Sequence, residues 1–579
     1  MAGDALAKEH KRNGEGKMAR KKYGVIKLSA AAGSLDHSKC SKSQLEVLKR
    51  HPVVYIYYGK KAFYVGQTKQ FLVRHGQHLR EKGTDYRKLD KILILYGQYV
   101  DGNSQTDLER LLITYLTADN NARPAKERKR CLNRTPGNWT PKYLTKEQVR
   151  AEVLAPFWRN ELMPEALAHE DHLEKLRQSI LFKYSPFADL SSEQVRLIEE
   201  IKKGGKNYLI EGLAGTGKTV VLTNLVAGLC ETESEKQPKI GVVVRKNWKD
   251  TAKKIFRAYG LGKNVCVNSA AGMIHTAEHY DIILVDEAHR LRWNYSKQHP
   301  STRKLFDKND PQKNELFLLG EMTDRLVLFY DGLQRIRPSD IPRADFSQYI
   351  KRHHFHKRAL WKQFRIQLHD TGASYTSDDY VSGICTFLQL EKKPYDRRVF
   401  QNQASDAYFG VVNSISELFA YVDEQRQYHP TAQCRVVAGY ARFWGSQYSP
   451  QKKKHTDFDW VEDEQNRWRW NNSQERWLFR PDTEDEIGSI HAVQGNDLDY
   501  VGVIIARDIG IVDGKVVAVK ENYYDNLGTP IKKGDYEKEL TQYVKQVYYV
   551  LLTRGISGIR VYFEDDALKR YFMKEVGLQ

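Results

Sequence analysis

The stretch Gly212-Leu213-Ala214-Gly215-Thr216-Gly217-Lys218-Thr219 decides how the rest of this 579-residue chain is interpreted. It follows the apolar run Tyr208-Leu209-Ile210 and precedes the apolar stretch Val220-Val221-Leu222, which predicts a strand, a glycine-rich loop and a helix in that order. Because they lack side chains, Gly212, Gly215 and Gly217 allow backbone N–H groups to turn onto phosphates at the positive end of that helix.

The two residues that end this octapeptide predict its ligand. Lys218 is placed to reach the β- and γ-phosphates of ATP, and the Thr219 hydroxyl is placed to bind Mg²⁺. The alternative is a glycine-rich turn that Lys-Thr follows by chance. The predicted strand before it and the predicted helix after it favour the ATP site.

An acidic pair, Asp286-Glu287, ends the apolar run 281–285. An NTPase needs carboxylates at the carboxyl end of such a strand. Asp286 would hold Mg²⁺, and Glu287 would orient and deprotonate the attacking water. The next apolar run, 325–330, leads to Gln334, which is placed to sense the γ-phosphate.

The second half of the chain has no glycine-rich loop of this kind, but it has two arginines that a second domain would contribute. Arg365 follows Gln363-Phe364, and Arg554 follows the run 548–553. Arginines that face a nucleotide from another domain complete the site when the cleft between the domains closes. We therefore expect both to act as arginine fingers.

The motifs form an ordered set: Gly-Leu-Ala-Gly-Thr-Gly-Lys-Thr, Val-Asp-Glu-Ala-His, Phe-Tyr-Asp-Gly-Leu-Gln, Gln-Phe-Arg, Ile-His-Ala-Val-Gln-Gly and Tyr-Val-Leu-Leu-Thr-Arg-Gly. As a set they resemble superfamily 1 helicases and, more closely, the Schlafen group 3-like ATPase/helicase domain, across about residues 183–579. The resemblance implies an α/β fold with two RecA-like parallel-sheet domains. It further implies an ATP site that is coupled to nucleic acid by Gln494 and Gly495 and is formed by Lys218, Thr219, Asp286, Glu287, Gln334, Arg365 and Arg554.

Gln194 lies on a predicted helix upstream of the glycine-rich loop. In many helicases a glutamine at this place reads the adenine edge, so Gln194 is a candidate nucleotide-binding residue. A lone glutamine on a helix more often faces solvent, and the sequence favours neither interpretation.

The first 150 residues predict a small α+β module. The runs 52–58 and 62–66 are rich in β-branched and aromatic residues and flank a Gly-Lys-Lys turn, which predicts a tight hairpin. A helix, a third strand at 92–96 and a second helix follow. These elements and the loop after them carry the candidate residues Tyr55, Tyr64, Arg74, His78, Glu109 and Asn133.

This order and these residues resemble the GIY-YIG nuclease family across about residues 52–140. The resemblance implies that Tyr55 or Tyr64 acts as the base or positions the water. It implies that Arg74 holds the scissile phosphate, and that Glu109 is the single protein ligand of Mg²⁺ or Mn²⁺.

Two further residues of this group, His78 and Asn133, would shape and brace the nuclease site. The sequence departs from the family at Val53-Val54-Tyr55, which lacks the leading glycine of the first motif. The alternative interpretation is a sheet with ordinary tyrosines and a helix with a solvated glutamate.

The positive charge of the chain is concentrated in this module. Residues 1–150 contain 31 Lys+Arg and 14 Asp+Glu, a net charge of +17 out of +19 for the whole chain. Such an excess is typical of a part that binds a polyanion. A solvated basic tail is an alternative for residues 8–22, but it does not account for the basic residues of 58–91 and 123–150.

Cysteine usage and hydropathy indicate the cellular compartment in which we expect the protein. The six cysteines are scattered without a CxxC pair, which fits a reducing cytosol and argues against a structural zinc site. No apolar run approaches the ~20 residues of a membrane span, and the N-terminus lacks the apolar core of a secretory signal. We therefore expect a cytoplasmic protein with no membrane partner.

We predict five parts: a basic N-terminal extension at 1–45, the nuclease domain at 46–145, a helical linker at 146–182, a first RecA-like domain with the glycine-rich loop at 183–340, and a second at 341–579. Two stretches allow alternatives. The tryptophans of 452–480 either pack in the domain, which their mixed local charge favours, or stack on bases. The polar segment 291–316 is an insertion or a mobile loop.

Together these features predict ATP-dependent nucleic-acid processing, in which a helicase-like motor presents DNA to a metal-dependent endonuclease. The expected role is antiviral (antiphage) defence against foreign DNA, with repair as the next role. The alternative is a nucleotide-gated switch or assembly ATPase that regulates the nuclease without unwinding. RNA is an alternative target because phosphate contacts and stacking do not identify the sugar. A homo-oligomer or a defence-system partner protein is compatible with both functions.

Overall fold

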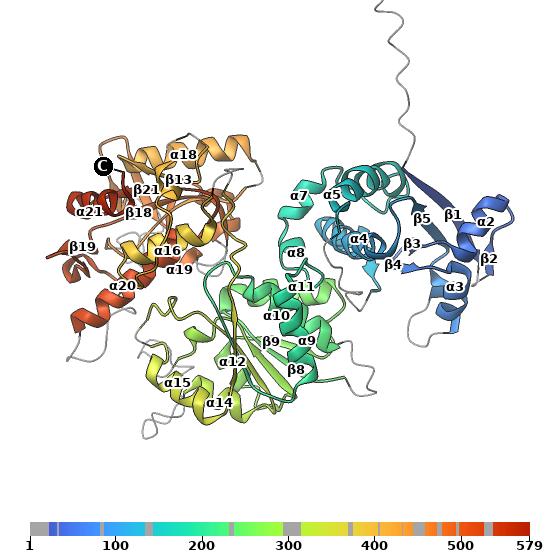
Figure 1. Cartoon of the computed structure of the whole chain (residues 1–579), viewed down its shortest axis with the longest axis horizontal. Helices are drawn as coiled ribbons and strands as arrows, with labels where there is room; N and C mark the ends of the chain where they lie inside the picture. Colours follow the sequence, from blue (N-terminus) through green and yellow to red (C-terminus); the bar gives the residue numbers. More distant parts are fainter. Residues whose placement is uncertain are drawn as a thin grey trace, which may run out of the picture. The chain divides into compact units, whose positions relative to one another are not determined.

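The computed structural model describes residues 22–31, 34–80, 86–133, 143–230, 237–292, 314–337, 339–368, 374–402, 404, 406–430, 432–443, 458–471, 477–493, 497–525 and 536–578 (Figure 1). The chain divides into two compact units. Unit 1 is Met1–Phe182 with Ala258–Gly260, and unit 2 is Lys183–Arg257 with Leu261–Gln579. Within the described ranges, no helix combines the length and the apolar character that crossing a membrane requires.

Unit 1 is built on a six-stranded sheet with the order β2-β1-β5-β3-β4-β6. Its strands pair antiparallel, except that β4 and β6 are parallel. The strands are β1 (Tyr23–Ala31), β2 (Ser34–Asp36), β3 (Val53–Tyr58), β4 (Ala62–Thr68), β5 (Lys91–Gly97) and β6 (Arg130–Cys131). Residues 23–31 and 34–36, which we placed in the N-terminal extension, therefore form two strands of this sheet.

The predicted hairpin is β3–β4, in which Tyr55 pairs with Gly66 and Tyr57 with Tyr64. Phe71, the first residue of α3, packs against the rings of Tyr55 and Tyr57. The main helices are α2 (Lys42–Arg50), α3 (Phe71–Arg80) and α4 (Gly102–Ala122), and α4 contacts both strands of the hairpin.

The predicted helical linker consists of short helical segments that pack on α4. They are α5 (Lys146–Val149), η3 (Arg150–Leu154), α6 (Ala155–Phe157), η4 (Trp158–Leu162), α7 (Leu173–Gln178) and α8 (Ile180–Lys183). Buried Asp119 of α4 accepts hydrogen bonds from the N–H groups of His169 (3.2 Å) and Glu170 (2.7 Å). Residues 146–182 are thereby part of unit 1.

The first lobe of unit 2 contains a six-stranded parallel sheet with the order β12-β7-β11-β10-β8-β9. These strands are β7 (Tyr208–Gly212), β8 (Ile240–Val243), β9 (Val265–Asn268), β10 (Ile282–Val285), β11 (Leu326–Tyr330) and β12 (His356–Leu360). Helices cover both faces: α9 (Ser192–Lys203), α10 (Lys218–Cys230) and α11 (Lys246–Ala258) lie on one, and α12 (Ala270–Ile274), α14 (Glu315–Glu321) and α15 (Arg343–Arg352) on the other (Figure 1). The core of the second face includes Met273, Leu319 and Phe346.

The second lobe contains a sheet with the order β13-β21-β18-β14-β17-β16-β15, parallel except for the pair β15–β16. These strands are β13 (Phe409–Val412), β14 (Cys434–Ala438), β15 (Trp460–Val461), β16 (Arg467–Trp470), β17 (Glu486–Ser489), β18 (Leu498–Ile505) and β21 (Gly555–Phe563), with a separate hairpin of β19 (Ile509–Val512) and β20 (Lys515–Ala518). The helices are α16 (Ser377–Phe387), α17 (Arg398–Gln401), α18 (Ile415–Tyr428), α19 (Ile490–Val493), α20 (Tyr536–Leu552) and α21 (Asp566–Val576). The predicted α/β class with parallel-sheet domains is confirmed.

The four tryptophans of the 452–480 stretch are core residues. Trp460, Trp468, Trp470 and Trp477 are each at most 9 % exposed, and Trp468 stacks on Phe419 of α18. Because these rings are covered by protein, they pack in the lobe and do not form a platform for bases. Most of the segment 291–316 lies outside the described residues.

Candidate nucleotide site and candidate nuclease site

The glycine-rich loop joins β7 to α10, and its backbone requires glycine. Gly215 and Gly217 have φ angles of 82° and 79°, which side chains disfavour. A Cβ on Gly215 would also lie 2.1 Å from Gln363 Oε1. The segment after β12 closes onto the loop, because Phe364 N–H donates to Gly215 O (2.9 Å) and Gln363 Nε2 donates to Ala214 O (2.8 Å).

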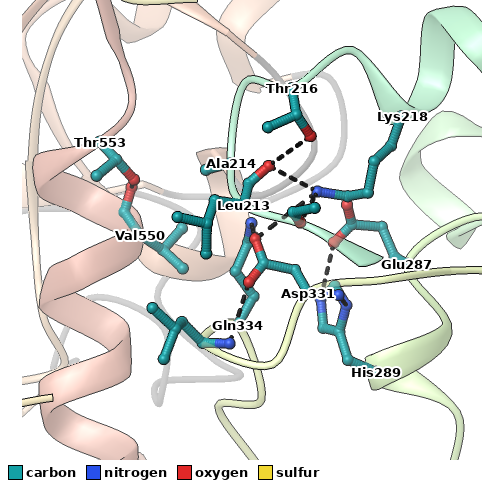
Figure 2. A network of polar contacts seen from close by, with 12 residues as sticks. Leu213, Ala214, Thr216, Lys218, Glu287, His289, Asp331, Gln334, Val550 and Thr553 are labelled. Atoms are coloured by element: carbon teal, nitrogen blue, oxygen red, sulfur yellow. Dashed lines mark hydrogen bonds and ion pairs between the residues drawn. The ribbon is translucent and has the colours of Figure 1, made fainter. Parts of the chain in front are cut away.

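Lys218 begins α10, and its side chain lies over the loop (Figure 2). Its Nζ donates to the carbonyl oxygens of Gly212 (2.7 Å) and Leu213 (2.9 Å) and lies 3.7 Å from Asp331 Oδ2. The ammonium group is therefore held at the loop by weak acceptors. Phosphate oxygens are stronger acceptors and would replace the carbonyls.

Thr219 and Asp286 are in direct contact. The Thr219 hydroxyl donates to Asp286 Oδ2 (3.1 Å). Burial, followed by the neighbouring charge of Glu287, raises the pKa of Asp286 to about 7. A cation beside Asp286 would reverse this effect, because it favours the ionised carboxylate.

Glu287 follows in the left-handed region, with φ 54°. Its Oε2 lies 3.0 Å from His289 Nε2. Burial opposes ionisation, but the His289 partner and the nearby Lys218 hold the pKa of Glu287 well below its usual range. Glu287 is therefore the ionised member of the acidic pair, which is the state that a general base requires.

Gln334 belongs to a short network below the loop (Figure 2). Its Nε2 donates to Asp331 Oδ2 (2.6 Å). The Asp331 N–H in turn donates to His289 Nδ1 (3.2 Å). The network joins the carboxyl ends of β10 and β11, so Lys218, Glu287 and Gln334 are linked through two residues, Asp331 and His289, that the sequence analysis did not single out.

Arg365 and Arg554 share an acidic neighbour that the sequence analysis missed. Arg365 Nε lies 2.8 Å from Asp497 Oδ1, and Arg365 Nη1 donates to Thr553 O (3.3 Å). Burial, followed by the charge of Arg365, lowers the pKa of Arg554 to about 10, while Asp497 opposes the shift. Tyr184 also donates to Asp497, at 3.3 Å. No motif marks Asp497, because its role depends on a residue 132 positions away.

These residues surround one cavity of about 290 Å³ within unit 2. Both lobes contribute to it. Its lining includes the predicted residues Gly215, Gly217, Lys218, Thr219, Asp286, Glu287, Gln334, Arg365 and Arg554, and also Arg245, Trp248 and Asp497. The oxygen donors Thr219 and Asp286 fit a divalent cation that prefers hard ligands, such as Mg²⁺.

Four predicted residues are not in the lining of this cavity, and the first of them, Gly212, accepts a hydrogen bond from Lys218, which lines it. Gln194 caps its own helix, with Oε1 accepting from Ser191 N–H (2.9 Å), and its Nε2 donates to Thr216 O (3.2 Å). Both ends of the amide are thereby engaged, and Gln194 supports the loop from behind. Gln494 and Gly495 lie outside the described residues.

In unit 1, the predicted nuclease residues converge on the hairpin and α3. The Tyr55 hydroxyl lies 2.8 Å from His78 Nε2, and the Tyr64 ring lies 5.3 Å from the His78 ring. Tyr86, which the sequence analysis did not select, packs against His78, with ring centres 4.2 Å apart and the planes tilted by 41°. Gly66 makes room for this arrangement, because a Cβ there would lie 2.4 Å from the Tyr55 ring.

Arg74 and Glu109 face the same tyrosine. Burial and the charge of Glu109 raise the pKa of Tyr64, while hydrogen bonds with Arg74 and Tyr86 oppose the shift. Burial raises the pKa of Glu109 to about 7, and contacts with Gln67 and Arg74 oppose it. A carboxylate, a guanidinium and a phenol therefore meet in one largely buried place.

Asn133 braces β4 from the loop after β6. Its Oδ1 accepts from Val65 N–H (3.0 Å), and its Nδ2 donates to Val65 O (2.7 Å). Beside the cluster, the Tyr57 hydroxyl lies 2.6 Å from His75 Nδ1. The sequence analysis missed this second pair because the sequence does not distinguish Tyr57 and His75 from ordinary residues of a sheet and a helix.

Two largely parallel sheets, the first of which carries the glycine-rich loop, contribute to one charged cavity and define a P-loop protein with two α/β lobes. Residues 205–565 match the family described as Schlafen group 3, DNA/RNA helicase domain. The chain belongs to this family.

Among individual proteins, the chain is similar to the uncharacterized protein YPL245W of Saccharomyces cerevisiae, with 26 % identity over 436 residues, 69 % of this chain and 89 % of that protein. Among solved structures it is similar to the Pif1 helicase from Candida albicans, with 12 % identity, TM-score 0.29 and coverage of 67 % and 99 % of the two chains. It is also similar to the Pif1 helicase from Bacteroides in complex with ADP-AlF3 and ssDNA, with 13 % identity, TM-score 0.26 and coverage of 66 % and 94 %.

Proposed function

We propose that unit 2 is an ATP-driven motor that acts on nucleic acid. The observation that carries the proposal is the single cavity in which Lys218, Thr219, Asp286 and Glu287 of one lobe meet Arg365 and Arg554. This is the set of charges that phosphoryl transfer needs: a cation on the phosphates, a carboxylate for the metal, a base for the water and arginines for the transition state.

In this proposal each residue has one task. Lys218 leaves the carbonyls of Gly212 and Leu213 and binds the β- and γ-phosphates. Thr219 and Asp286 hold Mg²⁺, which neutralises developing phosphate charge when it is bound. Glu287, kept ionised beside His289, takes the proton of the attacking water.

The two arginines couple ATP hydrolysis to movement of the lobes. Arg365 is held by Asp497 at 2.8 Å, so it must exchange this carboxylate for the γ-phosphate to reach the transition state. This exchange changes the contacts among β12, α20 and β18, because the residues that take part in it lie on these elements or directly beside them in the chain. Hydrolysis would restore the contact with Asp497, which gives a cycle between two arrangements of the lobes.

We further propose that unit 1 is a metal-dependent nuclease of the GIY-YIG type. The meeting of Tyr64, Arg74 and Glu109 beside Tyr55 and His78 supports this. Glu109 would ligate Mg²⁺ or Mn²⁺, Arg74 would neutralise the scissile phosphate, and a tyrosine would position or deprotonate the water. The positive charge of residues 1–150 suits a polyanionic substrate.

The proposed substrate is DNA, and the proposed role is cleavage of foreign DNA in antiviral defence in the cytoplasm, with RNA and DNA repair as the alternatives. One experiment tests the motor and the nuclease together. ATP hydrolysis is measured with single-stranded DNA, duplex DNA and RNA, and cleavage of each is followed with Mg²⁺ or Mn²⁺. Stimulated hydrolysis with strand displacement supports a motor, whereas ATP-induced oligomerisation without translocation contradicts it and supports a regulatory switch.

A further inference from the structure

The edge of the first sheet of unit 2 carries a basic surface that neither site uses. Residues 351–362 contain no Asp or Glu, and their cationic residues, all exposed, are Lys351, Arg352, Lys357, Arg358 and Lys362. The stretch includes β12, which is the last strand of its sheet and pairs with β7. Its positive charge is therefore presented along one extended edge.

A neighbouring segment extends this surface. Asn207 O accepts from His356 N–H (2.8 Å), and Asn207 Nδ2 donates to His353 O (3.4 Å). Exposed Lys206 lies next to Asn207 in the chain and so beside the edge. Glu200 of α9 faces the strand and pairs with Arg358, with Arg358 Nε at 3.0 Å from Oε2, so Arg358 is excluded from the argument below.

Aromatic rings accompany the cations. Trp361 is 78 % exposed and Phe364 is 42 % exposed, and Lys362 Nζ lies 5.4 Å from the centre of the Phe364 ring. Lysines on an edge strand also discourage pairing with other strands. That purpose does not explain an exposed tryptophan, because an apolar ring at the edge favours association.

A cavity begins at the same tryptophan. It has a volume of about 490 Å³, and Trp361 lines it together with Leu360, Tyr330 and Phe346. Its charged lining is of both signs: Arg343, Lys357 and Lys393 are cationic, and Glu211, Asp331, Asp378 and Glu391 are acidic. A space with aromatic walls and a border of mixed charge suits a planar, uncharged ring whose phosphate stays outside, on the basic edge.

We infer that the surface formed by Lys206 and residues 351–362 binds single-stranded nucleic acid, with phosphates on its lysines and an unpaired base on Trp361. This inference rests on the proposed function and names a contact surface for it. Exposed aromatic rings stack on unpaired bases, and spaced cations follow the phosphate chain. A duplex keeps its bases covered and would leave Trp361 unused.

The surface is connected to the nucleotide site through the chain. Trp361 precedes Gln363 by two residues, and Gln363 Nε2 donates to Ala214 O of the glycine-rich loop at 2.8 Å. The cavity also reaches Gly212 and Leu213, whose carbonyls hold Lys218. A strand bound here would therefore change the loop, which predicts that it stimulates ATP hydrolysis.

The test measures binding of a fluorescein-labelled oligothymidylate to the full chain in EDTA, so that the probe is not cut. Trp361→Ala should raise Kd about tenfold, and Trp361→Tyr should restore most of the affinity. Lys357→Gln with Lys362→Gln should reduce the slope of log Kd against log salt by about 1.4, because each phosphate contact contributes about 0.7 for single strands. The matched control, Arg570→Gln with Lys574→Gln, removes the same charge from α21, a helix elsewhere in unit 2, and should change neither quantity.

Each outcome is decisive because the variants are first compared with the parent protein by thermal unfolding. Unchanged Kd and salt slope in folded variants overturn the surface but leave the proposed function intact, provided that the parent protein binds the strand and its ATP hydrolysis is stimulated. Equal losses in the α21 control variant also overturn it, because they show a general charge effect. If the parent protein neither binds the strand nor responds to it, the proposed function fails as well.

Discussion

The nucleotide site of unit 2 and the tyrosine cluster of unit 1 are built in opposite ways. The nucleotide site collects charged side chains from two lobes around an open cavity. The cluster in unit 1 lies on a single hairpin with α3 and α4, and its phenols and imidazoles contact one another among buried rings beside one carboxylate and one guanidinium. In the proposed function a rearrangement of the lobes completes the nucleotide site, whereas the cluster in unit 1 is assembled within one buried core.

This difference indicates how each site can be disturbed. In unit 2, removing one charge should stop the chemistry with little effect on folding, because each lobe has its own core. In unit 1, Tyr55, Tyr57 and Tyr86 belong to the core cluster of the unit, and the buried His75 and His78 contact them. Substitutions there affect stability and chemistry together, so a clean test needs a residue at the border of the cluster.

The largest expected effect is that of Lys218→Ala. The variant should lose ATP hydrolysis to background, because Lys218 is the lysine held at the glycine-rich loop. Lys183, which also lines the cavity, pairs instead with Asp499 (3.7 Å). Unit 1 should keep its fold and, in the proposed function, its metal-dependent cleavage. Steady-state phosphate release and cleavage of a labelled DNA strand are measured side by side. Loss of both activities with unchanged thermal unfolding would mean that the two units do not act independently.

Glu109→Gln is the complementary change in unit 1. It keeps the volume of the side chain and removes the carboxylate, so cleavage should fall by a factor of about 10³ or more, as the proposed metal ligand is lost. Nucleic-acid-stimulated ATP hydrolysis should be unchanged. Gln67→Ala is a matched control, because Gln67 contacts Glu109 and is not a proposed ligand. Cleavage that persists in Glu109→Gln would show that the metal assignment is wrong.

The sequence predicted site residues only where they belong to a short motif of consecutive residues. Asp286 and Gln334 follow apolar strands, and parallel strands bring their carboxyl ends to one edge of the sheet. Asp497 could not be found in this way, because only folding brings it beside Arg365. The strand β1 was missed for a different reason. Its alternating pattern directly follows the Lys- and Arg-rich leader, whose charge dominated the interpretation.

The glutamine upstream of the loop shows a further limit of sequence patterns. Position alone allows Gln194 to read adenine or to face solvent, and neither describes its contacts. Its amide is engaged by Ser191 and by Thr216 O, and its Nε2 would lie 2.7 Å from a Cβ on Gly217. A residue that closes a capping box and supports the loop is not distinguishable by sequence from a base-reading residue. That Gln194 reads adenine stays a prediction.

Arg365→Ala tests whether the nucleotide site is shared between lobes. As an arginine finger, Arg365 should contribute a factor of about 10³ to the rate of ATP hydrolysis, with little change in ATP binding. Asp497→Asn is the informative partner, since it frees Arg365 without removing it. It should leave hydrolysis measurable and weaken its dependence on nucleic acid. Equal losses in binding and rate for Arg365→Ala would show a structural role instead.

The free energy of unfolding of unit 2 should also depend on pH, through His491 at the contact between its two lobes. Burial, followed by Arg337, lowers the pKa of His491 to about 4; Arg290 acts in the same direction, and Asp525 opposes it. The unfolded chain therefore binds the proton more tightly, so stability is complete above the ordinary pKa of 6.5 and is lost as pH falls toward 4. The contribution is about 3 kcal/mol. Urea unfolding at pH 7 and pH 4.5 measures it, and His491→Gln should show a smaller difference between the two conditions.

The smallest expected effect is that of Asn133→Ala in unit 1. The change removes two hydrogen bonds and leaves the Val65 N–H and C=O without their side-chain partner, which costs about 2 kcal/mol in the free energy of unfolding. Asn133→Asp keeps the acceptor but turns a buried carboxyl oxygen toward the Val65 carbonyl, so it should cost at least as much. If hydrogen exchange at Val65 is unchanged in Asn133→Ala, the brace is not needed to hold β4. In that case any loss of cleavage in the variant must arise at the reacting phosphate. Asn133 would then act in the reaction itself and not as a support of the cluster.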